Sequence, residues 1–137
     1  MITGLHHLGL TVSDAERSAR WYEAVLGFER VGGFGDTAAP RQKVFLRHPG
    51  FDIRLGLVEH HGAAKDRFDE TRAGLDHLAF EVASDQELVE WADRLRGLGI
   101  AFSPVAQSHS IPGAAVIVFR DPDNIQLELF TDPTKVR

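Results

Sequence analysis

Hydrophobic residues alternate with polar or small residues in eight short segments of this chain, and in two longer segments they recur at helical spacing. The longer segments predict amphipathic helices at about 14–26 and 85–97. Each half of the chain then has the order strand, helix, strand, strand, strand, so the expected fold class is α+β. The alternating segments predict strands, less regular in the second and sixth, at about 5–12, 28–34, 43–48, 52–58, 75–82, 100–107, 114–120 and 124–130.

The two halves share one order of elements because the sequence itself is repeated. The segment 4–12 (GLHHLGLTV) returns as 74–82 (GLDHLAFEV), with five of nine positions identical. We therefore expect a single domain, residues 1–137, built from two tandem βαβββ modules. Module one covers about 1–59, a linker about 60–73, and module two about 74–131.

Both expected helices carry similar signals at their ends. A Ser-x-x-Glu sequence starts at Ser13 and again at Ser84, and this pattern is typical of a helix N-terminus because both side chains bind free amides of the first turn. Gly27 and Gly99 follow the two helices, and glycine readily takes the left-handed conformation that ends a helix.

Alternation along the strands also assigns side chains to sheet faces. Apolar residues such as Leu10 and Leu127 are expected to face the helix of their module. By the same parity, the side chains of His7, His77 and Glu128 are expected on the opposite face, away from the helix. Two imidazoles and one carboxylate form a ligand set that leaves coordination positions of a metal open, as in catalytic sites.

The composition restricts the chemistry of such a site. The chain has no cysteine, which excludes disulfides, thiolate zinc sites, iron–sulfur clusters and cysteine nucleophiles. Imidazole and carboxylate ligands without thiolate are suited to one divalent metal ion, which could be Fe²⁺, Mn²⁺, Co²⁺, Ni²⁺ or Zn²⁺. The ligand types alone do not distinguish these metals.

Charge and hydropathy indicate where the protein works. The net charge is −5 with acids and bases interspersed, which disfavours nucleic acid as a partner. The longest apolar run, 114–119, is far shorter than a membrane span, and the N-terminus has no signal-type segment. With no cysteine, we expect a cytoplasmic protein without a membrane partner.

Three segments together resemble the vicinal oxygen chelate superfamily, which includes glyoxalase I, extradiol dioxygenases, fosfomycin-resistance thiol transferases and bleomycin-resistance proteins. The resemblance implies curved mixed sheets around a cleft, where a divalent metal is chelated by two neighbouring oxygens of a substrate. It places the metal ligands on His7, His77 and Glu128, and it implies a homodimer. The segments are LHHLGLTVSDAERSARWYEAVLGF at 5–28, GLDHLAFEV at 74–82 and FRDPDNIQLELF at 119–130.

Departures from the family pattern narrow the expected reaction. Glyoxalase I-like members have a fourth ligand, a glutamate, where the repeat places Gly56, so we read Gly56 as a vacant ligand position. Fosfomycin transferases generally have a threonine where this chain has Gly9. Extradiol dioxygenases share the three-ligand pattern but are usually about twice this length. None of these three reactions is assigned.

The function expected from the sequence is a metal-dependent enzyme, of lyase, isomerase or dioxygenase type, acting on a small oxygen-rich metabolite. The alternative is a metal-free binding protein of the bleomycin-resistance type. Beside the three ligands, Glu81 and His109 are candidates for proton transfer together with Glu128, which is both ligand and catalytic candidate. Candidate substrate-binding residues are Arg54, Gln126, Phe130 and Phe68.

Overall fold

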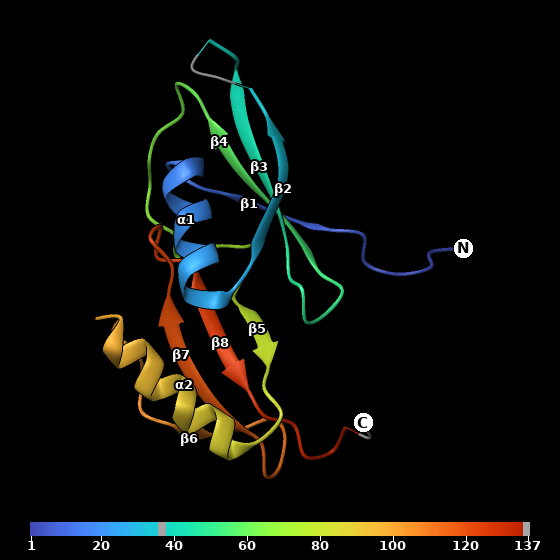
Figure 1. Cartoon of the computed structure of the whole chain (residues 1–137), viewed down its shortest axis with the longest axis vertical. Coiled ribbons are helices and arrows are strands. Elements are labelled where there is room, and N and C mark those ends of the chain that lie inside the picture. The colour runs from blue at the N-terminus through green and yellow to red at the C-terminus, as the bar shows by residue number, and fades with distance from the viewer. Residues whose placement is uncertain (36–37, 136–137) are drawn as a thin grey trace. The chain divides into compact units, whose positions relative to one another are not determined.

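The computed structural model describes residues 1–35 and 38–135, and the chain forms two compact units, the first spanning Met1–Asp66 and the second starting at Arg67. Each unit has the predicted βαβββ order, which confirms the α+β fold (Figure 1). The first unit contains β1 (Leu8–Thr11), α1 (Ala15–Leu26), β2 (Glu29–Phe34), β3 (Arg41–Arg47) and β4 (Arg54–His60). The second contains β5 (Leu78–Glu81), α2 (Asp85–Gly97), β6 (Ala106–Gln107), β7 (Ala115–Arg120) and β8 (Gln126–Phe130).

Each unit has one four-stranded mixed sheet. The strand orders are β1-β4-β3-β2 and β5-β8-β7-β6, in which β1 pairs with β4 and β5 with β8 in parallel, while the other pairs are antiparallel. In these parallel pairs Gly9 lies opposite Gly56, and Ala79 lies opposite Glu128. Gly56 and Glu128 therefore hold equivalent positions in the two sheets.

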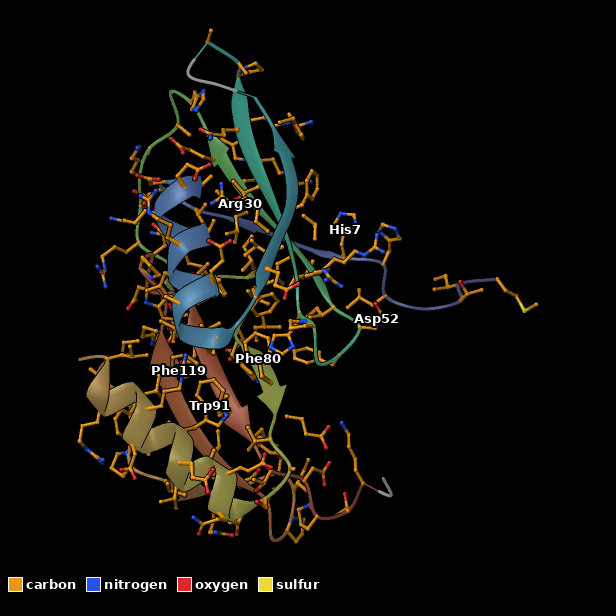
Figure 2. The ribbon with its side chains drawn as sticks, in the orientation of Figure 1. His7, Arg30, Asp52, Phe80, Trp91 and Phe119 are labelled. Atoms are coloured by element: carbon orange, nitrogen blue, oxygen red, sulfur yellow. The ribbon has the colours of Figure 1, made fainter. Side chains whose placement is uncertain are left out.

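The core of each unit lies between its helix and one face of its sheet. Tyr22 of α1 and Leu88 of α2 are fully buried there. On the opposite face of the first sheet Gly9 and Thr11 are exposed, as strand parity predicts. Among the described residues, no helix combines the length and the apolar character needed to cross a membrane. The sheets contribute buried Leu10, Val44, Leu46, Leu55 and Leu57 in the first unit, and Phe80, Ile117, Phe119, Leu127 and Leu129 in the second. Phe80 and Phe119 are labelled in Figure 2.

The start of α1 differs from the sequence expectation by one residue. Asp14, not Ser13, is the N-cap, and its Oδ1 atom accepts a hydrogen bond of 2.8 Å from the backbone amide of Arg17. The amide of Ala15 donates to the Glu59 carboxylate of β4 at 3.0 Å. The cap is thus shifted by one residue, because the Asp14 carboxylate accepts from Arg17 where the predicted Ser13 hydroxyl would have accepted from Glu16, and a carboxylate is the stronger acceptor.

The other helix ends follow the sequence signals. Ser84 is the N-cap of α2 and accepts from the amide of Glu87 at 3.2 Å, while the Glu87 carboxylate accepts from the amide of Ala83 at 2.9 Å. Gly27 and Gly99 have φ of 76° and 71°, in the left-handed region expected of glycines after a helix.

The strand expected at about 100–107 is shorter in the structure, where β6 covers only Ala106–Gln107. At Ser103 a side-chain hydrogen bond replaces one bond of the regular strand ladder. The Ser103 Oγ atom accepts from the Val118 amide at 2.9 Å, while the Ser103 amide donates to the Val118 carbonyl. Pro104 follows and has no amide hydrogen to continue a ladder. The side-chain bond and the proline together end the pairing.

Replacing the N-cap of α1 tests this helix start. We expect Asp14→Ala to lower the free energy of unfolding by about 1 kcal/mol, because the amide that it caps loses its acceptor. Ser13→Ala should cost clearly less, since Ser13 does not cap the helix. Urea unfolding followed by circular dichroism measures both variants, and a larger loss for Ser13→Ala would contradict the observed cap.

Candidate metal centre

Two of the expected metal ligands come together in the second unit. His77 directly precedes β5, and Glu128 lies on β8, the parallel neighbour of β5. The Nε2 atom of His77 is 3.6 Å from the Oε2 atom of Glu128, and the Glu128 side chain is only 15% exposed. This separation is too long for a hydrogen bond. Two donors that each lie about 2.1 Å from a shared ion are about 3 to 3.4 Å apart, so the pair fits an ion with little movement.

The second ring nitrogen of His77 is held by its neighbour in sequence. The Nδ1 atom of His77 lies 2.6 Å from the Oδ1 atom of Asp76. An ionised carboxylate only accepts hydrogen bonds, so Nδ1 carries the proton and the lone pair of Nε2 points toward the Glu128 side. A histidine whose distal nitrogen donates to a carboxylate is typical of metal sites, because the carboxylate fixes the ring and raises its basicity.

Further polar contacts support Asp76. The Nε2 atom of Gln126 donates to Asp76 at 3.4 Å, and its Oε1 atom accepts from Arg120 at 2.9 Å. Arg120 also donates two hydrogen bonds, of 2.9 and 2.7 Å, to the carboxylate of Glu70. A continuous set of contacts thus runs from Glu70, in the segment before β5, to His77. The amide of Gln126, expected to bind substrate, is engaged on both sides by protein groups.

The ion pair at the far end of this network is strongly held. Hydrogen bonding from the Arg120 guanidinium lowers the pKa of Glu70 from an ordinary 4.5 to about 2. The same contact raises the pKa of Arg120. Glu70 is therefore ionised at neutral pH, and the bidentate pair fixes the guanidinium that holds Gln126.

Sequence reasoning missed three members of this network. The sequence contains a feature that could have identified Asp76, because an acid adjacent to His77 is within reach of its ring. The feature for Arg120 is weaker, since it is only the repeat counterpart of Arg47. Glu70 had no such feature, since it lies in the segment expected to be a linker, and only folding brings it to Arg120.

The third expected ligand, His7, belongs to the first unit. It is exposed in the segment that leads into β1 (Figure 2). Its Nδ1 atom lies 2.8 Å from the Nδ1 atom of His6, which leaves Nε2 as the nitrogen available to a ligand. His6 thus occupies the repeat position of Asp76, with an imidazole in place of the carboxylate. No three histidine or acidic side chains form a metal-binding group in the part of the chain that the structure describes.

Gly56, the position equivalent to Glu128 in the first unit, supplies no ligand side chain, and the Lys43 side chain lies in the space beside it. A Cβ atom added to Gly56 would lie 2.7 Å from the Cε atom and 3.4 Å from the Nζ atom of Lys43. Lys43 also places its ammonium 4.9 Å from the centre of the Phe45 ring. The first sheet thus presents a cation where the second presents a carboxylate.

The proton-transfer candidates lie in exposed places. Glu81, on β5, forms an ion pair of 2.7 Å with Lys135. His109 is exposed in the loop between β6 and β7. The structure therefore pairs Glu81 with Lys135, and it shows no contact that assigns Glu81 or His109 a role in proton transfer.

The substrate-binding candidates are spread over both units. Phe130 is half-buried on β8 and has the same strand parity as Glu128. Phe68 is half-buried and is tied to the turn before β8, because its amide donates to the Asp123 carbonyl at 2.9 Å. Arg54 is exposed at the start of β4 in the first unit.

Comparison with known proteins places this arrangement in a family. A sequence model of the Glyoxalase/Bleomycin resistance protein/Dioxygenase superfamily matches residues 4–129. The chain belongs to this superfamily. The resemblance inferred from its three motifs is therefore confirmed over nearly the whole chain.

Members of the superfamily show both the fold and metal-dependent chemistry. The crystal structure of a glyoxylase/bleomycin resistance protein/dioxygenase domain from Frankia sp. EAN1pec is 37% identical, with a TM-score of 0.82 over 96% of this chain and 99% of that one. Fosfomycin resistance protein FosX of Listeria innocua is 25% identical over 94% of this chain and 90% of its own length. A manganese-dependent 2,3-dihydroxybiphenyl 1,2-dioxygenase of Geobacillus genomosp. 3 is 25% identical over 94% of this chain but only 36% of the dioxygenase.

The Glu70–Arg120 pair makes a pH-dependent contribution to stability. Because the pKa of Glu70 is depressed in the folded protein, this contribution is complete above about pH 4.5 and is lost as the pH falls through about 2. We expect Glu70→Gln to lower the thermal unfolding midpoint at pH 7, and the difference from wild type to shrink below pH 4.5. Differential scanning fluorimetry across this range measures it.

Glu90→Gln, which removes an exposed carboxylate from α2, is the control for the Glu70 variant. It should leave the midpoint almost unchanged. A difference between Glu70→Gln and wild type that does not depend on pH would contradict the assigned ion pair.

Proposed function

We propose that this protein is a divalent-metal-dependent enzyme that acts on a small oxygen-rich metabolite bound to the metal through two oxygens. The proposed ligands are His7, His77 and Glu128. The observation that carries the proposal is the pairing of His77 with Glu128 at 3.6 Å, with Asp76 bound to the other nitrogen of the histidine ring. A carboxylate on the second ring nitrogen is the usual support of a metal-binding histidine.

The donor set is consistent with the metals that imidazole and carboxylate bind, namely Fe²⁺, Mn²⁺, Co²⁺, Ni²⁺ and Zn²⁺. The relative from Geobacillus is manganese-dependent by name. Mn²⁺ is therefore the first ion to test. Three protein ligands leave open positions, which is the requirement for a substrate that chelates.

Such an ion, when bound, supplies Lewis acidity that stabilises negative charge developing on substrate oxygens. The protein residues supply orientation. Asp76, held by Gln126, fixes the His77 ring, and the half-buried Glu128 carboxylate is positioned by strand pairing. The aromatic ring of Phe130, on the same strand as Glu128, offers apolar contact area to a substrate.

Proton transfer is proposed for Glu81 or His109, because carboxylates and imidazoles serve as general acids and bases in enzymes. Of the two, Glu81 is paired with Lys135 at 2.7 Å. Lyase, isomerase and dioxygenase reactions all use a chelated substrate, so the proposal is a class of enzyme and not one reaction. A metal-free binding protein is the outcome that the metal measurement below would support instead.

We expect the wild-type protein to bind about one Mn²⁺ per chain in isothermal titration calorimetry, confirmed by elemental analysis. His77→Ala should abolish stoichiometric loading because it removes a ligand. Asp76→Asn should weaken affinity about 10- to 100-fold, since the ring loses its carboxylate partner but keeps its nitrogen.

His60→Ala is the matched control, because His60 is an exposed histidine at the end of β4. Its metal affinity should equal that of wild type. If His77→Ala binds Mn²⁺ as tightly as the control, the proposed ligand assignment is wrong, and a wild-type protein that binds no metal favours the metal-free alternative.

We propose that the protein works as a homodimer in which His7 of one subunit joins His77 and Glu128 of the other. Neither His7→Ala nor Glu128→Ala should bind Mn²⁺ stoichiometrically alone. Mixing and re-equilibrating them should restore up to one site per mixed dimer, measured by Mn²⁺ titration. A monomeric mass in sedimentation at micromolar concentration would contradict this arrangement.

A further inference from the structure

Lys43 occupies an unusual position in the first sheet. It lies on β3 with its side chain over Gly56, so that any Cβ at residue 56 would collide with its Cε atom at 2.7 Å. The side chain is half-buried and lies on the sheet face away from α1, because its strand neighbours Val44 and Leu46 face the core. Glycine at 56 is thus what permits the lysine to lie across the sheet.

The ammonium of Lys43 has no acidic partner among the described residues. Its recorded contact is with the face of the Phe45 ring, 4.9 Å from the ring centre. Several other basic side chains in the described ranges are paired with carboxylates, such as Arg47 with Glu29 at 2.7 Å and Lys135 with Glu81 at 2.7 Å. A half-buried cation held on an aromatic ring, without a counter-ion, is ready to receive an anion.

The position of Lys43 relates it to the proposed site. Gly56 is the register equivalent of Glu128, and it lies opposite Gly9 on the strand that follows His7. The Lys43 side chain therefore lies beside the Gly9–Gly56 pair, two residues along the chain from the proposed metal ligand His7. A divalent ion held by His7 and the Lys43 ammonium would both bring positive charge to this part of the first unit, so the charge balance there favours a negatively charged ligand.

We propose that Lys43 binds an anionic oxygen group of the substrate, and that the substrate class is a dianion that chelates the metal through two oxygens. This inference rests on the proposed function, because it needs the metal site to which His7 belongs. In this arrangement the metal takes the two chelating oxygens and the Lys43 ammonium neutralises the remaining negative charge. Gly56 then selects for anions by leaving room for the lysine.

The test uses the whole chain with two probes, Mn²⁺ and oxalate, a dianion that chelates through two oxygens. The protein is kept in excess over Mn²⁺, so that little free ion remains to bind oxalate. Titration calorimetry first gives the affinity for Mn²⁺ and then the affinity of the Mn²⁺-loaded protein for oxalate. We expect Lys43→Met to weaken oxalate binding at least tenfold and Lys43→Arg to retain most of it. Mn²⁺ affinity without oxalate should be unchanged or tighter in Lys43→Met, because a repelling cation is removed.

Arg47→Met is the matched control, since Arg47 lies on the same strand with the same parity but is already paired with Glu29. It should bind oxalate like wild type. Equal oxalate binding by Lys43→Met and wild type, or equal weakening in Arg47→Met, would overturn the inference while leaving the metal site intact. Absence of Mn²⁺ binding by wild type would overturn the proposed function and this inference with it. Circular dichroism and the Lys43→Arg variant separate lost binding from lost folding.

Discussion

The parallel pairing of the first and last strands of each unit is the constraint on which the rest of the structure depends. Parallel neighbours cannot be joined by a hairpin, so a helix and two antiparallel strands lie between them in the chain. The helix covers one face of the sheet and buries its apolar side chains. The residue before the first strand is thereby brought beside a residue of the last strand on the other face, and this brings His77 to within 3.6 Å of Glu128.

The two units have kept the same register but have different chemistry at equivalent positions. His7 and His77 both contact the preceding residue through Nδ1, with His6 in the first unit and Asp76 in the second. Gly56 and Glu128 are equivalent, yet the first carries no side chain and gives its space to Lys43. One repeat can therefore supply a carboxylate and the other an ammonium without any change of backbone.

The polar network of the second unit links a segment outside the sheet to the candidate metal ligand. Glu70 is held by Arg120, and Arg120 in turn holds the Gln126 amide that contacts Asp76. Each side chain limits the freedom of the next, because a planar guanidinium and an amide have directional hydrogen bonds. The orientation of His77 thus depends on residues beyond its immediate partner Asp76.

The sequence by itself determined the βαβββ repeat, the α+β class and the sheet faces along β1, β5 and β8, because hydrophobic period and internal repetition are local properties of the chain. It also identified His77 and Glu128 as partners by parity and repeat position. Only the tertiary structure decided that Asp14 caps α1, that Lys43 fills the space at Gly56, and that Glu70 reaches Arg120. These depend on side-chain directions and on contacts between segments distant in sequence, which periodicity does not encode.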